Sequence, residues 1–295
     1  MLDLLVSSQT SITRSSLQVD VDGAPAIQTG TGHADPSKNW FSPICCTLIQ
    51  GPRSAILVDT PVTGDLAEKL AEWVKQTAPG KQLRYIYTTH AHGDHFFGNP
   101  VLLRHFPQAE CVATPSVARA IAKQLPDGVD MWKQMFPGGQ VPEGQFSPTS
   151  LPPGGEFSID GAPLFGIDVL YSDTEASSFL YVPELKLVVC GDIVCGDCYQ
   201  FFGEASTPEK RQMWLQSLDQ IASLDPHIVV PGHKRPSQVN GSYLISATRG
   251  YILAFEAELK RSDDAEHLER NIVAQYPNRL NKFLECSCKS SVNEA

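Results

Sequence analysis

The fold is decided by a run of eleven residues, Thr89-His90-Ala91-His92-Gly93-Asp94-His95-Phe96-Phe97-Gly98-Asn99. The run follows an apolar stretch, residues 83–88, which predicts a β-strand. His90 and His92 are two residues apart, so in an extended chain both imidazoles point to one side and converge on one cation. Asp94 and His95 lie where the chain bends and face a second cation. Three of the eight histidines fall within six residues, which favours a two-metal site over a solvated polar loop.

Strands and helices are predicted on both sides of this run. Upstream, residues 44–49 and 54–59 form a hairpin around Gly51-Pro52, and an amphipathic helix covers residues 66–77. Downstream we expect helices at 97–106, 116–124, 209–224, 242–261 and 264–275, and strands at 110–114, 156–159, 163–171, 178–182, 186–190 and 227–230. No linker separates the two halves. The sequence therefore predicts a single domain, residues 1–295, in which helices cover two sheets.

Three segments depart from this regular pattern. Residues 1–40 are polar and are expected to be irregular. Residues 240–295 are expected to contain helices only, without further strands. Residues 125–155 are rich in proline and glycine but also contain Trp132, Met135, Phe136 and Phe146, which favours a packed flap over a linker. Trp132 and Phe136 are suited to covering an apolar substrate and excluding water. They equally suit a contact between two copies of the chain, so a homodimer stays open.

Composition narrows the class of protein. The formal charge is −10, and an acidic surface repels phosphate backbones, which disfavours a nucleic-acid partner. We find neither a membrane-spanning apolar window nor a signal peptide, so we expect a cytoplasmic protein without a membrane partner. The eight cysteines are expected to be reduced thiols. Cys195-x-x-Cys198 lacks a second such pair and is a weak indication of a redox or metal site.

The histidine run resembles the HxHxDH signature of the metallo-β-lactamase superfamily. Three further elements of that family follow the same order within residues 44–236: Ala55-Ile56-Leu57-Val58-Asp59-Thr60, a strand ending in an aspartate; Val188-Val189-Cys190-Gly191-Asp192, the strand with the bridging aspartate; and Pro231-Gly232-His233, the last metal histidine. The resemblance implies an α+β fold, the four-layer αβ/βα sandwich of two mixed β-sheets flanked by helices. It places the metals at one edge of the two sheets.

One position differs from the family pattern. Where the family has a Gly-His-Thr-x-Gly-Ser-like run, this chain has Tyr171-Ser172-Asp173-Thr174-Glu175-Ala176-Ser177-Ser178, and Asp173 takes the place of the metal-binding histidine. We hypothesise a first site of His90, His92 and Asp173 and a second of Asp94, His95 and His233, bridged by Asp192. We expect two divalent ions, above all zinc, although a carboxylate ligand admits manganese or iron more evenly than a third imidazole would. Alternatively, Asp173 is merely polar and the first site is weak or empty.

Other polar residues have less specific patterns. Asp59 ends an apolar strand, so its carboxylate is expected to be buried with partners. It either anchors the following loop or orients a metal histidine, and both can hold. The four remaining histidines have no neighbouring ligands and are expected in surface or structural roles: His33, His105, His227 and His267.

The expected chemistry is hydrolysis of a carboxylic ester, thioester or amide, above all a cyclic one. Two divalent ions sharing a hydroxide supply a nucleophile at neutral pH and polarise the substrate carbonyl. Asp94 is placed to hold a metal and to steer the hydroxide or take its proton. No GxSxG motif indicates a serine nucleophile. Tyr199 is a candidate to present its hydroxyl to a carbonyl oxygen, or else it is a core tyrosine.

The substrate class rests on a softer resemblance. Three stretches together resemble a clade of microbial and fungal hydrolases, some of whose relatives open lactams or lactones of small metabolites: Ser172-Asp173-Thr174-Glu175, residues 194–200, and Pro231-Gly232-His233-Lys234-Arg235-Pro236. A small-molecule substrate is therefore expected. A thioester hydrolase of the same fold, a mononuclear Fe(II) enzyme resembling the persulfide dioxygenases, and a binding protein without activity are the alternatives. Oxygen uptake would distinguish the iron enzyme, because a hydrolase consumes no oxygen.

Overall fold

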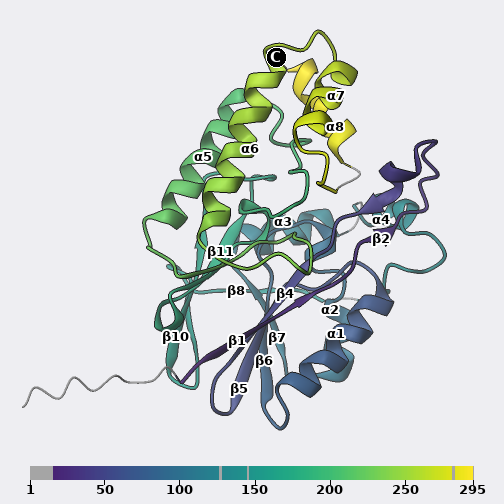
Figure 1. Ribbon diagram of the computed structural model, residues 1–295. Helices are drawn as coiled ribbons and strands as arrows, with labels where there is room; N and C mark the ends of the chain where they lie inside the picture. The colour runs from purple at the N-terminus through teal and green to yellow at the C-terminus, as the bar shows by residue number, and fades with distance from the viewer. Residues whose placement is uncertain (1–15, 126–127, 145, 281–282, 295) are drawn as a thin grey trace, which may run out of the picture.

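The computed structural model describes residues 16–125, 128–144, 146–280 and 283–294. Two mixed sheets face one another, with helices on the outer face of each (Figure 1). The first sheet has the strand order β1 (Gln18–Gly23), β4 (Cys45–Gln50), β5 (Ser54–Val58), β6 (Gln82–Tyr87), β7 (Glu110–Ala113) and β8 (Thr149–Ser150). The second has the order β13 (Ile228–Val230), β12 (Leu187–Val189), β11 (Ser178–Val182), β10 (Ala162–Asp168) and β9 (Glu156–Ile159). The predicted αβ/βα sandwich is confirmed.

The first sheet is apolar on both faces because each face packs against another layer. The β4–β5 hairpin is antiparallel, with Thr47 opposite Val58 and Gln50 opposite Ala55. Along β5, Leu57 faces α1 (Gly64–Thr77) and α2 (Asn99–His105), whereas Ile56 and Val58 face the second sheet. Burial of each such side chain contributes about 1.5–3 kcal/mol. This double burial explains why both strands of the hairpin could be recognised as apolar runs.

Between the sheets lies a core that both contribute to. Ile49 and Tyr87 from the first sheet pack with Leu164, Leu180 and Val189 from the second. On the outer face of the second sheet, α5 (Pro208–Ala222) and α6 (Tyr243–Leu259) bury Trp214 and Phe255 completely. These two helices run along the side of the molecule opposite α1 and α2 in Figure 1.

The expectation that residues 1–40 are irregular is wrong for part of that segment. Residues 18–23 form β1, which pairs antiparallel with β4 from Gln18 opposite Gln50 to Gly23 opposite Cys45. A short strand, β2 (Ile27–Gln28), pairs with β3 (Trp40–Phe41), and a 3-10 helix, η1 (Pro36–Asn39), lies between them. The edge of β4 is a template for pairing, and this tertiary partner is not visible in the local sequence. Residues 1–15 lie outside the described residues.

The predicted flap contains regular structure and is packed. Beyond α3 (Pro115–Gln124), the segment 125–155 holds the short helix α4 (Val129–Met135) and β8. Trp132, Met135 and Phe136 are buried in one cluster with Phe41 and Phe96. Residues 126–127 and 145 lie outside the described part of this segment.

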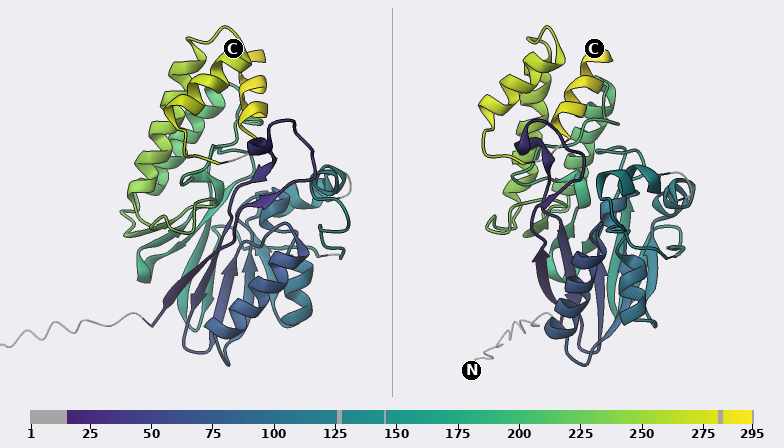
Figure 2. Two further views of the ribbon diagram at one scale, coloured as in Figure 1. Left: turned by 45° about the vertical axis from the view of Figure 1, so that its right-hand side comes forward. Right: turned by 90° about the vertical axis from the view of Figure 1, so that its right-hand side faces the viewer.

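The described residues of the C-terminal segment form three helices rather than the two predicted. After α6 come α7 (Ala265–Gln275) and the unpredicted α8 (Leu284–Asn293). Figure 2 shows these yellow helices beside the purple N-terminal segment that carries η1. Lys38 joins the two parts, with its Nζ 2.6 Å from Glu269 Oε1 and 3.2 Å from Glu285 Oε2.

Two further properties of the described residues bear on function. No helix among them is both long enough and apolar enough to cross a bilayer. All eight cysteines are free thiols, and seven are buried while Cys286 on α8 is exposed.

Candidate metal centre

The candidate ligands come from both sheets and meet at one end of the sandwich. His90 and His92 follow the carboxyl end of β6, and the 3-10 helix η2 (Gly93–His95) carries Asp94 and His95. From the second sheet, Asp173 lies in the β10–β11 loop, Asp192 in the 3-10 helix η4 (Gly191–Ile193) after β12, and His233 just after β13. The parallel pairs β5–β6 and β12–β13 bring these carboxyl ends to the same edge.

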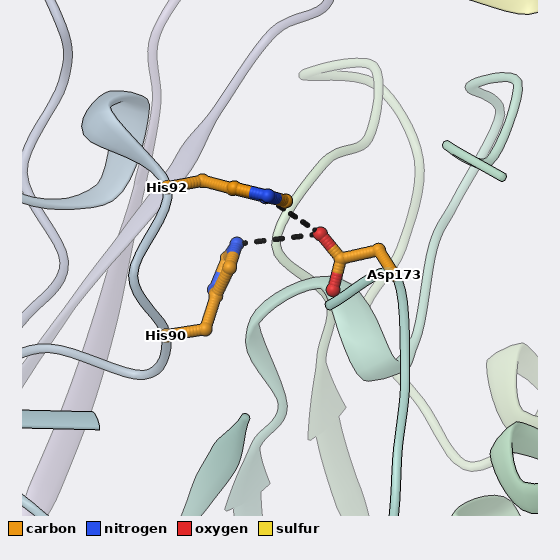
Figure 3. A group of neighbouring side chains, drawn as sticks. All are labelled: His90, His92 and Asp173. Carbon is orange, nitrogen blue, oxygen red and sulfur yellow. Dashed lines mark ion pairs between the residues drawn. The ribbon is translucent and has the colours of Figure 1, made fainter. Parts of the chain in front are cut away.

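The first group contains His90, His92 and Asp173. Their ligand atoms all lie within 4.8 Å of one another. Asp173 Oδ2 is 2.8 Å from His92 Nδ1 and 3.5 Å from His90 Nε2 (Figure 3). The hydroxyl of Ser172 donates to the other oxygen, Asp173 Oδ1, at 2.7 Å. Asp173 therefore turns one carboxylate oxygen toward both histidines, where the hypothesis places it.

The second group contains Asp94, His95 and His233. Asp94 Oδ2 is 3.2 Å from His233 Nε2 and 3.5 Å from His95 Nε2. Asp192 lies between the two groups: its Oδ1 is 3.3 Å from His95 Nε2 and its Oδ2 is 3.4 Å from His233 Nε2. Asp192 also forms a third group with His90 and His95. The structure thus brings all seven expected ligands together.

Several of the candidate ligand atoms are buried without hydrogen-bond partners, as expected of atoms that bind a cation. Within the described residues, Nε2 of His90, Nε2 of His95 and Oδ1 of Asp192 are buried without a hydrogen bond. Leaving such an atom unsatisfied costs about 1–3 kcal/mol, and more when it is charged. Imidazole nitrogen and carboxylate oxygen are the donors that zinc and similar divalent ions take. The donor set fits divalent cations.

Buried opposite charges in the ligand groups balance one another. Burial raises the pKa of Asp94, but His95 and His233 outweigh this effect and lower it to about 2. Burial lowers the pKa of His95, but the carboxylates of Asp94, Asp192 and Asp59 outweigh it and raise the pKa to about 10. The carboxylates around His95 therefore favour positive charge at this position, which is the charge that a divalent cation supplies.

Asp59 meets both expectations set for it. It accepts hydrogen bonds from the Thr89 backbone N–H and the Thr89 hydroxyl, each at 2.8 Å, which anchors the start of the histidine loop. Its Oδ2 is also 2.9 Å from His95 Nδ1, which leaves His95 Nε2 facing the site. The backbone of Asp59 has a φ of 61°, in the left-handed region that aspartate tolerates better than most residues.

A cavity of about 300 Å³ opens over the candidate ligands. Its wall is formed largely by apolar side chains, namely Phe41, Met131, Trp132, Phe201 and Phe283. Trp132 lines the cavity as expected. Phe136 does not: it is buried behind Trp132, with the two rings stacked at 6.4 Å between centroids. No lysine or arginine is among the described residues that line this cavity.

The structure corrects the expectation for Tyr199. Its hydroxyl donates to the Tyr276 carbonyl at 2.8 Å, and its ring packs in the core cluster under α5 and α6. It does not line the cavity. Seven positions of separation from Asp192 do not fix where a side chain points, and here the chain turns Tyr199 toward the carbonyl of the C-terminal segment.

Sequence reasoning missed Glu204, Phe201 and Phe283. Glu204 Oε1 is 3.1 Å from His92 Nε2, and Glu204 lines the cavity. It belongs to no motif, so no local signal marks it. Phe201 belongs to an aromatic run, Tyr199-Gln200-Phe201-Phe202, soon after Asp192, which is a signal that could have been used.

The remaining histidines lie away from the centre. Three of them contact carboxylates: His33 contacts Glu285, His105 contacts Glu68 and His267 contacts Asp263. The fourth, His227, is exposed.

A family model described as the metallo-beta-lactamase superfamily matches residues 40–233, more than half of the chain. The chain belongs to the metallo-β-lactamase superfamily. The matched range contains all seven candidate ligands, and the family fold is a metal-binding one.

Solved metallo-β-lactamase structures share this fold at low sequence identity. A metallo-β-lactamase family protein from Thermus thermophilus has a TM-score of 0.61 at 16% identity, covering 92% of this chain and 91% of that one. The metallo-β-lactamase from Pontibacter korlensis has a TM-score of 0.58 at 16% identity, covering 81% and 96%. The enzyme FIM-1 from Pseudomonas aeruginosa, solved in a mono-zinc form, has a TM-score of 0.54 at 16% identity, covering 82% and 92%.

A curated relative matches over a shorter stretch. A hydroxyacylglutathione hydrolase from Synechococcus sp. (strain CC9902) is 46% identical over 61 residues. The match covers 21% of this chain and 22% of that relative, so the chain spans only about a fifth of its length.

Proposed function

We propose that this protein is a metal-dependent hydrolase that opens a cyclic ester or amide, a lactone or lactam, of a small metabolite. The observation that carries the proposal is the cavity over the metal centre. Its floor is formed by candidate ligands, including Asp94, Asp192 and His233, and its walls by aromatic side chains without a cationic group. Its volume of about 300 Å³ is at the lower end for small-molecule sites.

Two divalent ions, above all zinc, fit the ligand groups. His90, His92 and Asp173 would hold the first, Asp94, His95 and His233 the second, with Asp192 shared between them. When bound, such ions supply Lewis acidity toward a carbonyl and lower the pKa of water toward neutrality.

The protein's own residues would then orient the substrate and handle the proton. Asp94 is ionised because His95 and His233 lower its pKa to about 2, and it lines the cavity. Its position in the cavity, rather than its basicity, is what places it to receive a proton and pass it to the leaving oxygen or nitrogen. Trp132 and Phe201 would cover an apolar ring and exclude bulk water.

Apart from the ions themselves, the side chains that line the cavity favour a neutral substrate over an anionic one. Beyond the candidate ligands, the charged residue that lines it is Glu204, a carboxylate. A substrate with carboxylates of its own, such as a glutathione conjugate, would meet no lysine or arginine among the described lining residues.

A thioester is the second candidate substrate. The 61-residue match to a hydroxyacylglutathione hydrolase favours it, because that relative's name describes thioester chemistry. The two candidates predict different preferences, since one requires a neutral ring and the other an anionic conjugate.

A hydrolysis screen with quantified metal tests the proposal. The purified protein, loaded with Zn²⁺, Mn²⁺ or Fe²⁺, is assayed against neutral lactones and lactams and against neutral and anionic thioesters. We expect turnover of a neutral ring substrate, lost in Asp94→Asn. Preference for an anionic thioester would replace the first candidate with the second. Inactivity on every ester and amide, with oxygen consumption by the iron form, would refute hydrolysis altogether.

A further inference from the structure

The four histidines of the metal centre are each held by a second contact on the ring nitrogen that faces away from the site. His95 Nδ1 contacts Asp59 at 2.9 Å, and His233 Nδ1 contacts the Pro43 carbonyl at 2.9 Å. His90 Nδ1 lies 3.0 Å from the Thr89 hydroxyl. Because a neutral imidazole carries one N–H, an acceptor on one nitrogen leaves the lone pair of the other for a metal.

His92 is oriented the other way round. It turns Nδ1 toward the site, 2.8 Å from Asp173 Oδ2, and its Nε2 faces Glu204 Oε1 at 3.1 Å. An ionised carboxylate only accepts hydrogen bonds. Glu204 therefore places the His92 proton on Nε2. The lone pair of Nδ1 is then free to bind the cation.

Glu204 also contacts the loop that carries the third ligand of the first site. Its second oxygen, Oε2, accepts a hydrogen bond from the Thr174 hydroxyl at 2.6 Å. Thr174 follows Asp173 directly in the chain. One carboxylate thus connects the histidine loop of the first sheet with the aspartate loop of the second, although its own side chain is 48% exposed at the cavity.

We infer that Glu204 is a positioning residue of the first metal site, which fixes His92 as an Nδ1 ligand and holds the Asp173 loop against it. Glu204 does for His92 what Asp59 does for His95. The inference rests on the metal occupancy in the proposed function but not on the substrate. It predicts that loss of Glu204 weakens the first site selectively, because the Asp94, His95 and His233 group has no contact with it among the described interactions.

Metal titration of the whole chain tests this role. Metal-free wild type, Glu204→Ala, Glu204→Gln and Thr174→Val are titrated with Co²⁺ while its visible absorption and the bound metal are measured. We expect Glu204→Ala to weaken one of two Co²⁺ equivalents by about 10- to 100-fold and to leave the other unchanged. Glu204→Gln keeps an oxygen acceptor and should lose less, as should Thr174→Val.

Glu175→Gln is the matched control. It removes an exposed carboxylate from the loop that holds Asp173 and Thr174, so it changes the charge near the site without removing a contact to His92. It should bind both Co²⁺ equivalents as wild type does. Glu204→Gln keeps the test valid if Glu204→Ala does not fold.

Three results would overturn the inference: wild-type Co²⁺ affinities in both Glu204 variants, equal weakening of the two equivalents, or the same weakening in Glu175→Gln. These readouts need no substrate. A protein that binds two Co²⁺ with Glu204-dependent affinity but hydrolyses nothing would refute the proposed function and leave this inference standing.

Discussion

At the scale of single residues, Asp173 defines what is particular to this metal centre. It stands where the superfamily pattern has a histidine, and it directs Oδ2 at both His90 and His92 while Ser172 holds Oδ1. Replacing a neutral imidazole by a carboxylate lowers the net charge of a loaded site by one. A carboxylate oxygen is also a harder ligand than an imidazole nitrogen, so the site should bind hard divalent ions more readily.

Removing this carboxylate should empty the first site. In Asp173→Ala we expect the bound metal to fall from two equivalents to one, measured by elemental analysis after dialysis against buffered Zn²⁺. Asp173→His should restore two equivalents and shift the preference from Mn²⁺ toward Zn²⁺. Unchanged stoichiometry and affinity in Asp173→Ala would show that Asp173 is not a ligand.

Asp59 is expected to stabilise the metal-free protein as well as to orient His95. It is buried and contacts Thr89 and His95 at 2.8–2.9 Å. Asp59→Ala should lower the free energy of unfolding of the metal-free protein by about 3–5 kcal/mol, because it leaves a buried charged partner uncompensated. Urea denaturation measures this loss. Asp59→Asn, which keeps an oxygen acceptor, should lose less, and equal stability of all three proteins would contradict the role.

At the scale of elements, short helices complete the cavity that the sheets begin. α4 contributes Met131 and Trp132, and the N-terminal end of α8 contributes Phe283 and Cys286. Neither helix was predicted from the sequence, because each is short and is held by tertiary contacts. Part of the substrate-facing surface is thus formed by helices that the sequence does not predict.

Trp132 should govern substrate binding rather than metal binding. Trp132→Phe keeps an aromatic ring but leaves a gap in the cavity wall, so we expect KM for an apolar substrate to rise several-fold with little change in kcat. Steady-state kinetics and metal content measure the two effects. Phe136→Leu, which alters the ring behind Trp132, is the control and should change KM less. Loss of metal in Trp132→Phe would contradict this division.

The attachment of α8 to η1 should depend on pH through Glu285. Hydrogen bonds from Lys289 and Lys38 lower the pKa of Glu285 from its usual 4.5 to about 2. Its contribution to stability is therefore complete above about pH 4.5 and lost as the pH falls toward 2. At pH 7, Glu285→Gln should lower the free energy of unfolding by up to about 1 kcal/mol. This difference, measured by urea denaturation, should shrink below pH 4.5; a difference that grows with acidity would contradict it.

At the scale of the whole molecule, the metal centre joins two half-structures. The first sheet supplies His90, His92, Asp94 and His95, and the second supplies Asp173, Asp192 and His233. Bound ions would therefore connect the two sheets at one edge of their shared core.

Metal removal should accordingly lower the thermal stability of the entire chain. A ligand present at a thousand times its Kd stabilises the folded state by about 4 kcal/mol. For a chain of this size, such a change corresponds to a Tm shift on the order of 10 °C. Differential scanning calorimetry with and without a chelator measures it. A Tm that is unaffected by the chelator would argue against metal bridging of the sheets.

The sequence predicted the parts of the molecule that local pattern determines. The HxHxDH run, Asp192 and His233 each follow an apolar strand, and strand ends fix their positions. β1 and α8 could not be predicted, because their stability comes from β4 and from η1 and α7. Glu204 lies 112 residues from His92, and only the folded chain brings the two together. Tyr199 was misplaced because chain distance from Asp192 does not set side-chain direction.

The exposed thiol on α8 offers a single site for chemical labelling of this protein. Cys286 lies at the cavity while the other seven cysteines are buried, and burial raises the pKa of several of them, that of Cys45 to about 12. A maleimide fluorophore should therefore attach at one position in the unmutated chain. There the fluorophore would report substrate entry by a change in emission. A bulkier reagent at the same position would block access to the cavity.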